Sequence, residues 1–136
     1  LTALKTAALS GVDVKITLPG KSDSTVVYWS SMSYVAELIE AGIEVYLFQG
    51  GFNHSKILMI DSSFATVGSA NMDIRSFEDN FELLAMIYDP KLTMKLETQF
   101  HKDLKRSKKV NLTKWQKRPI KQNFKESIAR LFSPLF

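Results

Sequence analysis

The sequence predicts a domain of the α/β class, in which a mixed β-sheet is flanked by helices. Apolar residues alternate in "VDVKITL" (12–18), which is the period of a strand, and recur at helical spacing on either side of it. The order helix, strand, helix, strand, followed by several closely spaced strands, is typical of a sheet covered by helices. The length of 136 residues suits one domain, so we assign residues 1–136 to a single domain.

The first half of the chain is predicted to alternate between helices and strands. An opening helix is expected to end before Gly11, and the strand at 12–18 is ended by the turn signal that begins at Pro19. A single helix is expected over 25–41, because its apolar residues form one stripe and Gly42 follows as a C-terminal stop.

The middle of the chain is predicted to be rich in strands. The expected strands are 43–49, 55–61, 64–69 and 81–89, with a tight turn between the second and the third. The last of them, "FELLAMIYD", is almost wholly apolar. We therefore expect it to be a central strand covered on both faces.

Two helices are predicted near the C-terminus. Pro90 suits the first turn of a helix that runs to about Arg106, and a last helix is expected over 121–131. One face of the last helix carries an apolar stripe, formed by Ile120, Phe124, Ile128 and Leu131. Because helical apolar stripes are usually core, we expect this stripe to dock on the sheet.

A second interpretation of this end of the chain places it at a bilayer. Aromatic residues lie among its lysines and would sit at head-group depth: Trp115, Phe124, Phe132 and Phe136. Basic residues are dense from Lys102 to Lys125, where Asp103 is the only acidic residue. Such a block favours an anionic partner (lipid head groups, nucleic acid or an acidic protein), or else it is a solvated surface. We treat residues 107–136 as a basic amphipathic C-terminal extension.

The composition narrows the possible chemistry and the possible origin of the chain. It contains no cysteine, which excludes disulfides and thiolate zinc sites. The chain begins at Leu1 without an initiator methionine, and no signal peptide or apolar run of membrane-spanning length is visible. We therefore expect a soluble fragment of a longer protein.

The stretch "NHSKILMIDSSFATVGSAN" (53–71) carries the chemistry. Residues two apart on a strand point the same way, so His54 and Lys56 are expected to project together, as are Ser69 and Asn71. Lys56, Ser69 and Asn71 are donors suited to the oxygens of a phosphodiester. The imidazole of His54 suits attack on phosphorus or transfer of a proton. Glu82 is our candidate for the acceptor that fixes the histidine tautomer.

The full spacing is H-x-K, four residues, D, six residues, G-S-x-N, and it resembles the signature of the phospholipase D superfamily. The segments "GVDVKITLPGKSDS", "GSANMDIRSFEDNFELLAMIYD" and "ARLFSPLF" resemble the C-terminal half of the bacterial cardiolipin synthases. The resemblance implies an α/β/α sandwich and a reaction in which two phosphatidylglycerols become cardiolipin and glycerol through a phosphohistidine.

The same resemblance assigns roles to the residues of the motif. His54 is either the nucleophile or the general acid–base, and Lys56 and Asn71, with Ser69, bind phosphate. Glu82 holds the histidine. Asp61 belongs to the catalytic motif, although a role in organising the hairpin is favoured for it. No metal and no cofactor are expected.

One departure from the family concerns the number of motifs. The family builds its active site from two H-x-K motifs, and this chain has one. The missing half is expected from a preceding half-domain of the polypeptide or from a second copy of the chain.

The other partners expected are anionic phospholipid, chiefly phosphatidylglycerol, and the cytoplasmic surface of the cell membrane, with no nucleic acid. Two alternatives remain: a phospholipase D-type phosphodiesterase or nuclease that acts as a homodimer, and a fragment that only binds phosphate or a partner.

Overall fold

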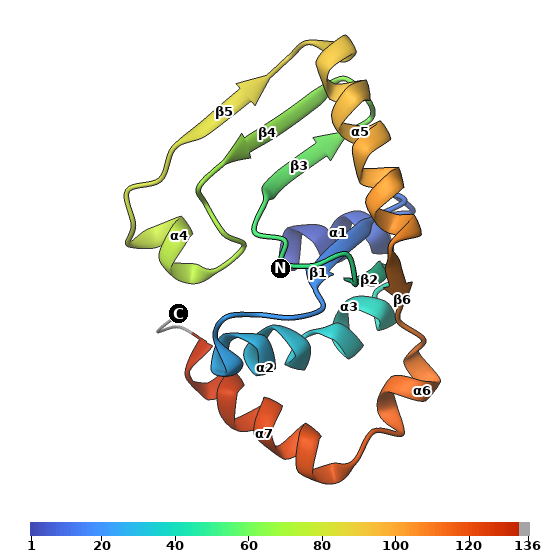
Figure 1. Cartoon of the computed structure of the whole chain (residues 1–136), viewed down its shortest axis with the longest axis vertical. Coiled ribbons are helices and arrows are strands. Elements are labelled where there is room, and N and C mark those ends of the chain that lie inside the picture. Colours follow the sequence, from blue (N-terminus) through green and yellow to red (C-terminus); the bar gives the residue numbers. More distant parts are fainter. Residues whose placement is uncertain (134–136) are drawn as a thin grey trace.

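The computed structural model of the chain describes residues 1–133 and contains two small sheets with helices around them (Figure 1). The helices are α1 (Thr2–Leu9), α2 (Thr25–Ser33), α3 (Val35–Glu40), α4 (Ile74–Glu78), α5 (Pro90–Lys105), α6 (Leu112–Gln116) and α7 (Ile120–Leu131). The strands are β1 (Lys15–Pro19), β2 (Glu44–Phe48), β3 (Lys56–Ile60), β4 (Phe64–Gly68), β5 (Leu84–Ile87) and β6 (Ser107–Lys109).

The strands form two three-stranded sheets rather than the single sheet that we predicted. In the first, β1 and β2 are parallel and β6 runs antiparallel to β2, so this sheet is mixed. The second contains β3, β4 and β5 in that order, and all its pairs are antiparallel. Helix α5 runs along one side of the molecule, from the end of β5 to β6 (Figure 1). The α/β class with flanking helices is thus confirmed.

The hydrophobic core lies between the mixed sheet and helices α2 and α3. Its fully buried members come from these helices and from β2 with the residue that precedes it: Met32, Val35, Leu38, Ile43 and Val45. Apolar side chains of α1 and β1 pack around this cluster. The main core is therefore built on the mixed sheet, and fewer buried side chains pack against the second sheet.

The helix predicted over 25–41 is divided into α2 and α3 at Tyr34. Next to the break, the hydroxyl of Ser33 donates a hydrogen bond to the carbonyl oxygen of Ser30 at 2.6 Å. Bonds of this kind compete with the helical pattern and bend helices. The stop expected at Gly42 is confirmed, since this residue has a φ of 92°.

The prediction of a central strand over 81–89, covered on both faces, is wrong. Strand β5 is shorter, and it lies at the edge of the second sheet beside β4. Leu84 and Met86 are exposed. An apolar run shows that a strand is to be covered, but it does not show that the cover comes from the same chain.

The C-terminal extension is joined to the rest of the domain by β6 and by the packing of α7 on α2. The prediction that the apolar stripe of α7 docks on the sheet is wrong. Ile120 and Phe124 are 85% and 64% exposed, whereas Glu126 and Ala129 are buried. Phe136, one of the aromatic residues singled out above, lies outside the described residues. Over residues 1–133, no helix has the length and apolar character needed to cross a membrane.

A buried ion pair explains why α7 packs through its polar face. Arg118 donates two hydrogen bonds to the carboxylate of Glu126, at 2.7 and 2.8 Å. The guanidinium also stacks on the ring of Trp115, 3.5 Å from the ring centroid. A buried carboxylate is stable only when it is paired in this way.

We predict that Arg118→Ala lowers the free energy of unfolding by about 3 kcal/mol, because it leaves Glu126 buried without its partner. Lys109→Ala is the control. It removes the exposed pair with Glu44 and should cost at most about 1 kcal/mol. Urea denaturation followed by circular dichroism measures both changes. Equal losses in the two variants would contradict the role of the buried pair.

Candidate active site

The second sheet aligns the predicted site residues through its register. Lys56, the first residue of β3, pairs with Gly68, and Gly68 pairs in turn with Leu84. Paired residues place their side chains on the same face of a sheet, and so do residues two apart on a strand. The register therefore brings His54 and Glu82, each two residues before its strand begins, to the same edge of the sheet as Lys56.

Gly68 is required by the close approach of β4 and β5. A Cβ atom at this position would lie 2.1 Å from the carbonyl oxygen of Leu83 and 2.9 Å from the Cα of Leu84. Both are backbone atoms, which do not move aside as a side chain does. The glycine of the G-S-x-N motif thus keeps the row between Lys56 and Leu84 free of a side chain.

Glu82 is the centre of a hydrogen-bond network at this end of the sheet. Its carboxylate accepts hydrogen bonds from the hydroxyls of Ser69 and Ser76, the latter at 3.1 Å. The Ser76 hydroxyl in turn accepts the backbone N–H of Asn71 at 3.0 Å. The Ser69 hydroxyl accepts the backbone N–H of Leu83 at 3.0 Å. Both ends of the G-S-x-N segment are therefore tied to one carboxylate.

The network also sets the charge state of Glu82. The hydrogen bond from Ser69 is the largest cause that lowers the pKa of this carboxyl below its usual value, and bonds from Ser76 and Asn80 act in the same direction. The positive charge of Lys56 lowers the pKa as well. These contacts therefore favour the ionised form of Glu82.

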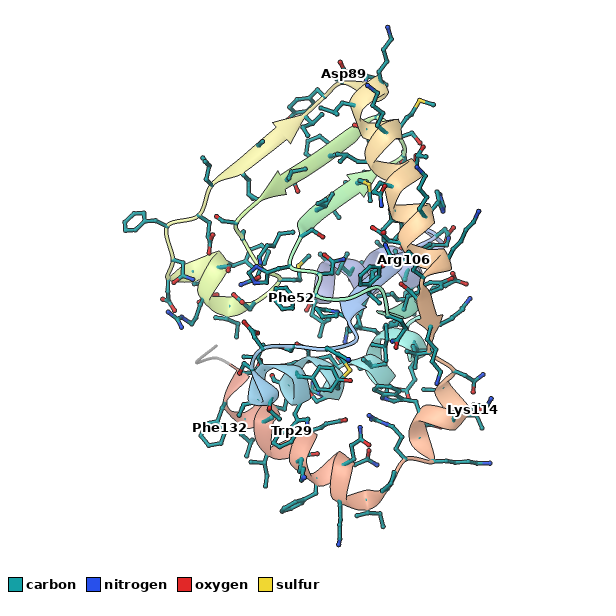
Figure 2. The ribbon with its side chains drawn as sticks, in the orientation of Figure 1. Trp29, Phe52, Asp89, Arg106, Lys114 and Phe132 are labelled. Atoms are coloured by element: carbon teal, nitrogen blue, oxygen red, sulfur yellow. The ribbon has the colours of Figure 1, made fainter. Side chains whose placement is uncertain are left out.

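His54 lies in the loop before β3. The ammonium of Lys56 donates a hydrogen bond to the backbone carbonyl of His54 at 3.0 Å, which fixes the two residues relative to each other. The imidazole is exposed and stacks on the ring of Phe52, with 5.6 Å between the centroids and 18° between the planes. Figure 2 shows Phe52 in the middle of the molecule, where the chain enters β3.

The expected hydrogen bond between Glu82 and the imidazole is not formed. Among residues 1–133, the side-chain partners of the Glu82 carboxylate are Ser69, Ser76 and Asn80. The carboxylate is held toward β4 and α4 by these bonds, whereas the histidine lies outside the paired part of the sheet. The tautomer of His54 is therefore not fixed by Glu82 in this structure.

Asp61 lies away from the cluster, in the turn that joins β3 to β4. It has a φ of 49°, and the next residue, Ser62, has a φ of 53°. Asp61 is five positions beyond Lys56 along a strand, a separation of about 17 Å. Left-handed backbone favours residues such as Asp, so the position is that of a hairpin-forming residue.

Sequence reasoning missed Ser76, which is buried and links Glu82 to Asn71. A local signal for it was present. Asp73 caps α4 by accepting the backbone N–H of Ser76 at 2.8 Å, and an Asp three residues before a Ser is a recognisable helix start. Helix α4 was overlooked because it is only one turn long.

The arrangement has the groups that phosphodiester chemistry needs. Lys56 and the exposed imidazole of His54 lie at one edge of the sheet, where the Glu82 carboxylate also orders Ser69 and Ser76. A fixed cation stabilises the charge that develops on phosphoryl oxygens, and an accessible imidazole serves as a nucleophile or proton carrier.

Comparison with known proteins agrees with this chemistry. Residues 1–104 match the family model described as "Cardiolipin synthase, PLD-like domain". Cardiolipin synthase 1 of Staphylococcus epidermidis is 47% identical over 135 residues, which are 99% of this chain and 28% of that protein. Cardiolipin synthase of Clostridium perfringens is 50% identical over 135 residues, with the same shares. The chain thus spans little more than a quarter of the length of these curated relatives.

A solved structure has a similar fold. The phospholipase D family member Nuc from Salmonella typhimurium superposes with a TM-score of 0.69 over 81% of this chain and 72% of that one. The sequence identity is 23%, so this likeness concerns the fold alone.

The lowered pKa of Glu82 predicts a pH dependence of stability. The folded state binds a proton at this carboxyl less readily than the unfolded state does, so the ionised group stabilises the fold near neutral pH. This contribution is lost as the pH falls through the lowered pKa. In Glu82→Gln the contribution is absent at every pH. Thermal melts between about pH 7 and pH 3 should converge for the two proteins on acidification, and parallel curves would contradict the proposed network.

We also predict that Gly68→Ala destabilises the second sheet by about 1–3 kcal/mol, because the added methyl group forces β4 and β5 apart. Gly50 is not a suitable comparison, since the atoms near it belong to the side chains of Arg106 and Phe48 rather than to the backbone. Ser63→Ala, in the β3–β4 turn, is the control. Melts that place both variants at the wild-type temperature would show that the sheet accommodates the methyl group.

Proposed function

Because the chain belongs to the family of cardiolipin synthase, phospholipase D-like domains, we propose that it is half of a phosphatidyltransferase active site. The parent enzyme would join two phosphatidylglycerol molecules into cardiolipin and glycerol. The observation that supports this most directly is the register of the second sheet, which brings His54, Lys56 and Glu82 to one edge of that sheet.

The proposed reaction has two steps that share one phosphorus atom. In the first, a histidine nitrogen attacks phosphorus, the phosphorus–oxygen bond to glycerol breaks, and the departing glycerol oxygen takes a proton. In the second, a hydroxyl of another phosphatidylglycerol attacks phosphorus, its proton is removed, and the phosphorus–nitrogen bond breaks. His54 is either the attacking histidine or the residue that supplies and then removes the proton.

The other site residues would act on the phosphate and on each other. Lys56 would stay beside the phosphoryl oxygens throughout, and Ser69 and Asn71 would complete the anion site. Glu82 would keep the G-S-x-N segment in place through Ser69 and Ser76. We assign Asp61 to the turn between β3 and β4.

The second half of the site is proposed to come from another phospholipase D-like unit, either a preceding half-domain or a second copy. Exposed apolar side chains support such a partner, because they lie on the segments that carry His54 and Glu82. They are Phe52, Met72, Phe77, Phe81 and Leu83. Exposed apolar groups gathered in one region mark surfaces that another unit covers.

We place the parent enzyme at the cytoplasmic face of the cell membrane, where phosphatidylglycerol is available. The basic residues between Lys102 and Lys125 support an anionic lipid surface as the partner.

We predict that His54→Ala lowers the turnover number of the parent enzyme by about a thousandfold or more, with little change in melting temperature, since the side chain is exposed. Lys56→Ala should cause a comparable loss, because the phosphate loses its fixed cation. The assay measures cardiolipin formed from phosphatidylglycerol.

His101→Ala is the matched control, because His101 is the other histidine of the chain and is exposed on α5. It should retain wild-type turnover. Mass spectrometry of acid-quenched enzyme then distinguishes the two roles of His54. A phosphatidyl adduct on His54 identifies the nucleophile, and an adduct on a histidine of the other half identifies His54 as the acid–base. Full turnover in His54→Ala would remove the residue from the mechanism.

A further inference from the structure

Helix α7 presents its apolar face to the outside. The side chains of the exposed stripe are 42–85% accessible, and they are Ile120, Phe124, Ile128 and Leu131. Phe132, which follows the helix, is also exposed and lies at its C-terminal end (Figure 2). On an ordinary surface helix, these residues would face the core. We call Ile120, Phe124, Ile128 and Leu131 the α7 stripe.

The opposite face of α7 is fastened to the domain by polar contacts. Glu126 is 3% exposed and paired with Arg118, and Ala129 is buried beside it. Arg130 donates to Glu37 at 2.8 Å, and its guanidinium lies 4.3 Å from the centroid of the Tyr34 ring. The groove between α2, α6 and α7 is lined largely by polar residues. These contacts set the orientation of α7 about its own axis. As a consequence, the α7 stripe points to the outside.

The charges around the α7 stripe are almost all positive. Glu126 is the only acidic residue from 107 to 136, and its charge is matched by Arg118. In the part of the chain that the structure describes, five lysines of this segment make no ion pair with an acidic side chain: Lys108, Lys114, Lys117, Lys121 and Lys125. Lys121 and Lys125 are on α7 itself, on one side of the stripe, and the Lys125 ammonium lies 5.1 Å from the centroid of the Trp29 ring.

We propose that α7 lies flat on an anionic lipid surface, with the α7 stripe among the acyl chains next to the head groups and the flanking lysines on lipid phosphates. A helix with an apolar face bordered by lysines binds a bilayer in this way. The proposal rests on the proposed function for the nature of the membrane, and it adds the surface by which the domain would be seated on it.

Charge favours a lipid surface over a second copy of the chain as the occupant of this face. In a dimer formed through α7, the lysines of one copy would meet the lysines of the other with no acidic partner nearby. Like charges placed together at an interface oppose association. An anionic bilayer, in contrast, attracts the lysines and covers the apolar residues between them.

The test is binding of the 136-residue chain to vesicles, measured by flotation. Wild-type protein should bind phosphatidylglycerol vesicles and bind phosphatidylcholine vesicles weakly. Replacing two stripe residues in the variant Phe124→Ser/Ile128→Ser should lower the partition coefficient on phosphatidylglycerol by about tenfold or more. Lys117→Gln/Lys121→Gln/Lys125→Gln should lower it as well, and this loss should shrink as salt is raised from about 0.1 M to 1 M.

Two controls are needed. One tests whether any exposed apolar side chain promotes binding, and the other tests whether binding depends on catalysis. Leu9→Ser/Met94→Ser removes apolar groups of similar exposure (73% and 56%) on α1 and α5, and it should bind as wild type does. His54→Ala should also bind as wild type does, because binding needs no turnover; failure of the catalytic proposal would therefore appear in the activity assay alone.

Two results would overturn the inference. One is unchanged vesicle binding by Phe124→Ser/Ile128→Ser while its thermal melt is that of wild type. The other is a wild-type dimer, measured by light scattering, that the same substitutions convert to a monomer, since a second copy would then cover the stripe. If Phe124→Ser/Ile128→Ser does not fold, Ile120→Ser/Leu131→Ser takes its place, because Ile120 and Leu131 are more exposed than Phe124 and Ile128.

Discussion

The pairing of Lys56 with Gly68, and of Gly68 with Leu84, is the constraint on which the candidate site depends. It brings the beginnings of β3 and β5 level with the end of β4, so the residues just outside each strand meet at one edge. A shift of one residue would turn every side chain of a strand to the other face. The bare backbone of Gly68 allows the close approach that keeps this register.

Glu82 orders the residues that this register brings together. Sequence reasoning gave this carboxylate the task of holding the imidazole, but its hydrogen bonds go to Ser69 and Ser76. It therefore orders the segment that ends β4, and the histidine is left on the exposed side, stacked on Phe52. The proposed half-site thus combines a segment ordered by Glu82 with an accessible imidazole, an arrangement suited to a reaction that a second unit would complete.

A buried carboxylate, that of Glu126, orients the helix at the other end of the molecule. Glu126 and Arg118 attach α7 by its polar face, and this turns the apolar face outward. The two glutamates act alike, because each holds one segment in place through polar contacts. Glu82 holds the G-S-x-N segment, and Glu126 holds α7. Exposed apolar side chains occur in both places, with Phe52 stacked on His54 and the α7 stripe along α7.

The sequence alone determined the class of fold and most of the helices and strands, and it singled out the motif from His54 to Asn71 as the candidate site. These follow from local information: period two in β1 and β2, proline at the start of α5, glycine after α3, and the spacing from His54 to Asn71. Only the tertiary structure decided whether the apolar surfaces of β5 and α7 are buried in the core or left exposed. The apolar patterns of β5 and α7 indicate that these surfaces are to be shielded from water. The pattern is identical whether the shield is the chain's own core or a partner outside the chain. The choice was made by the ion pair between Arg118 and Glu126, which joins the α6–α7 connection to α7, and by the register of the second sheet. Neither can be predicted from the periodicity of a single segment.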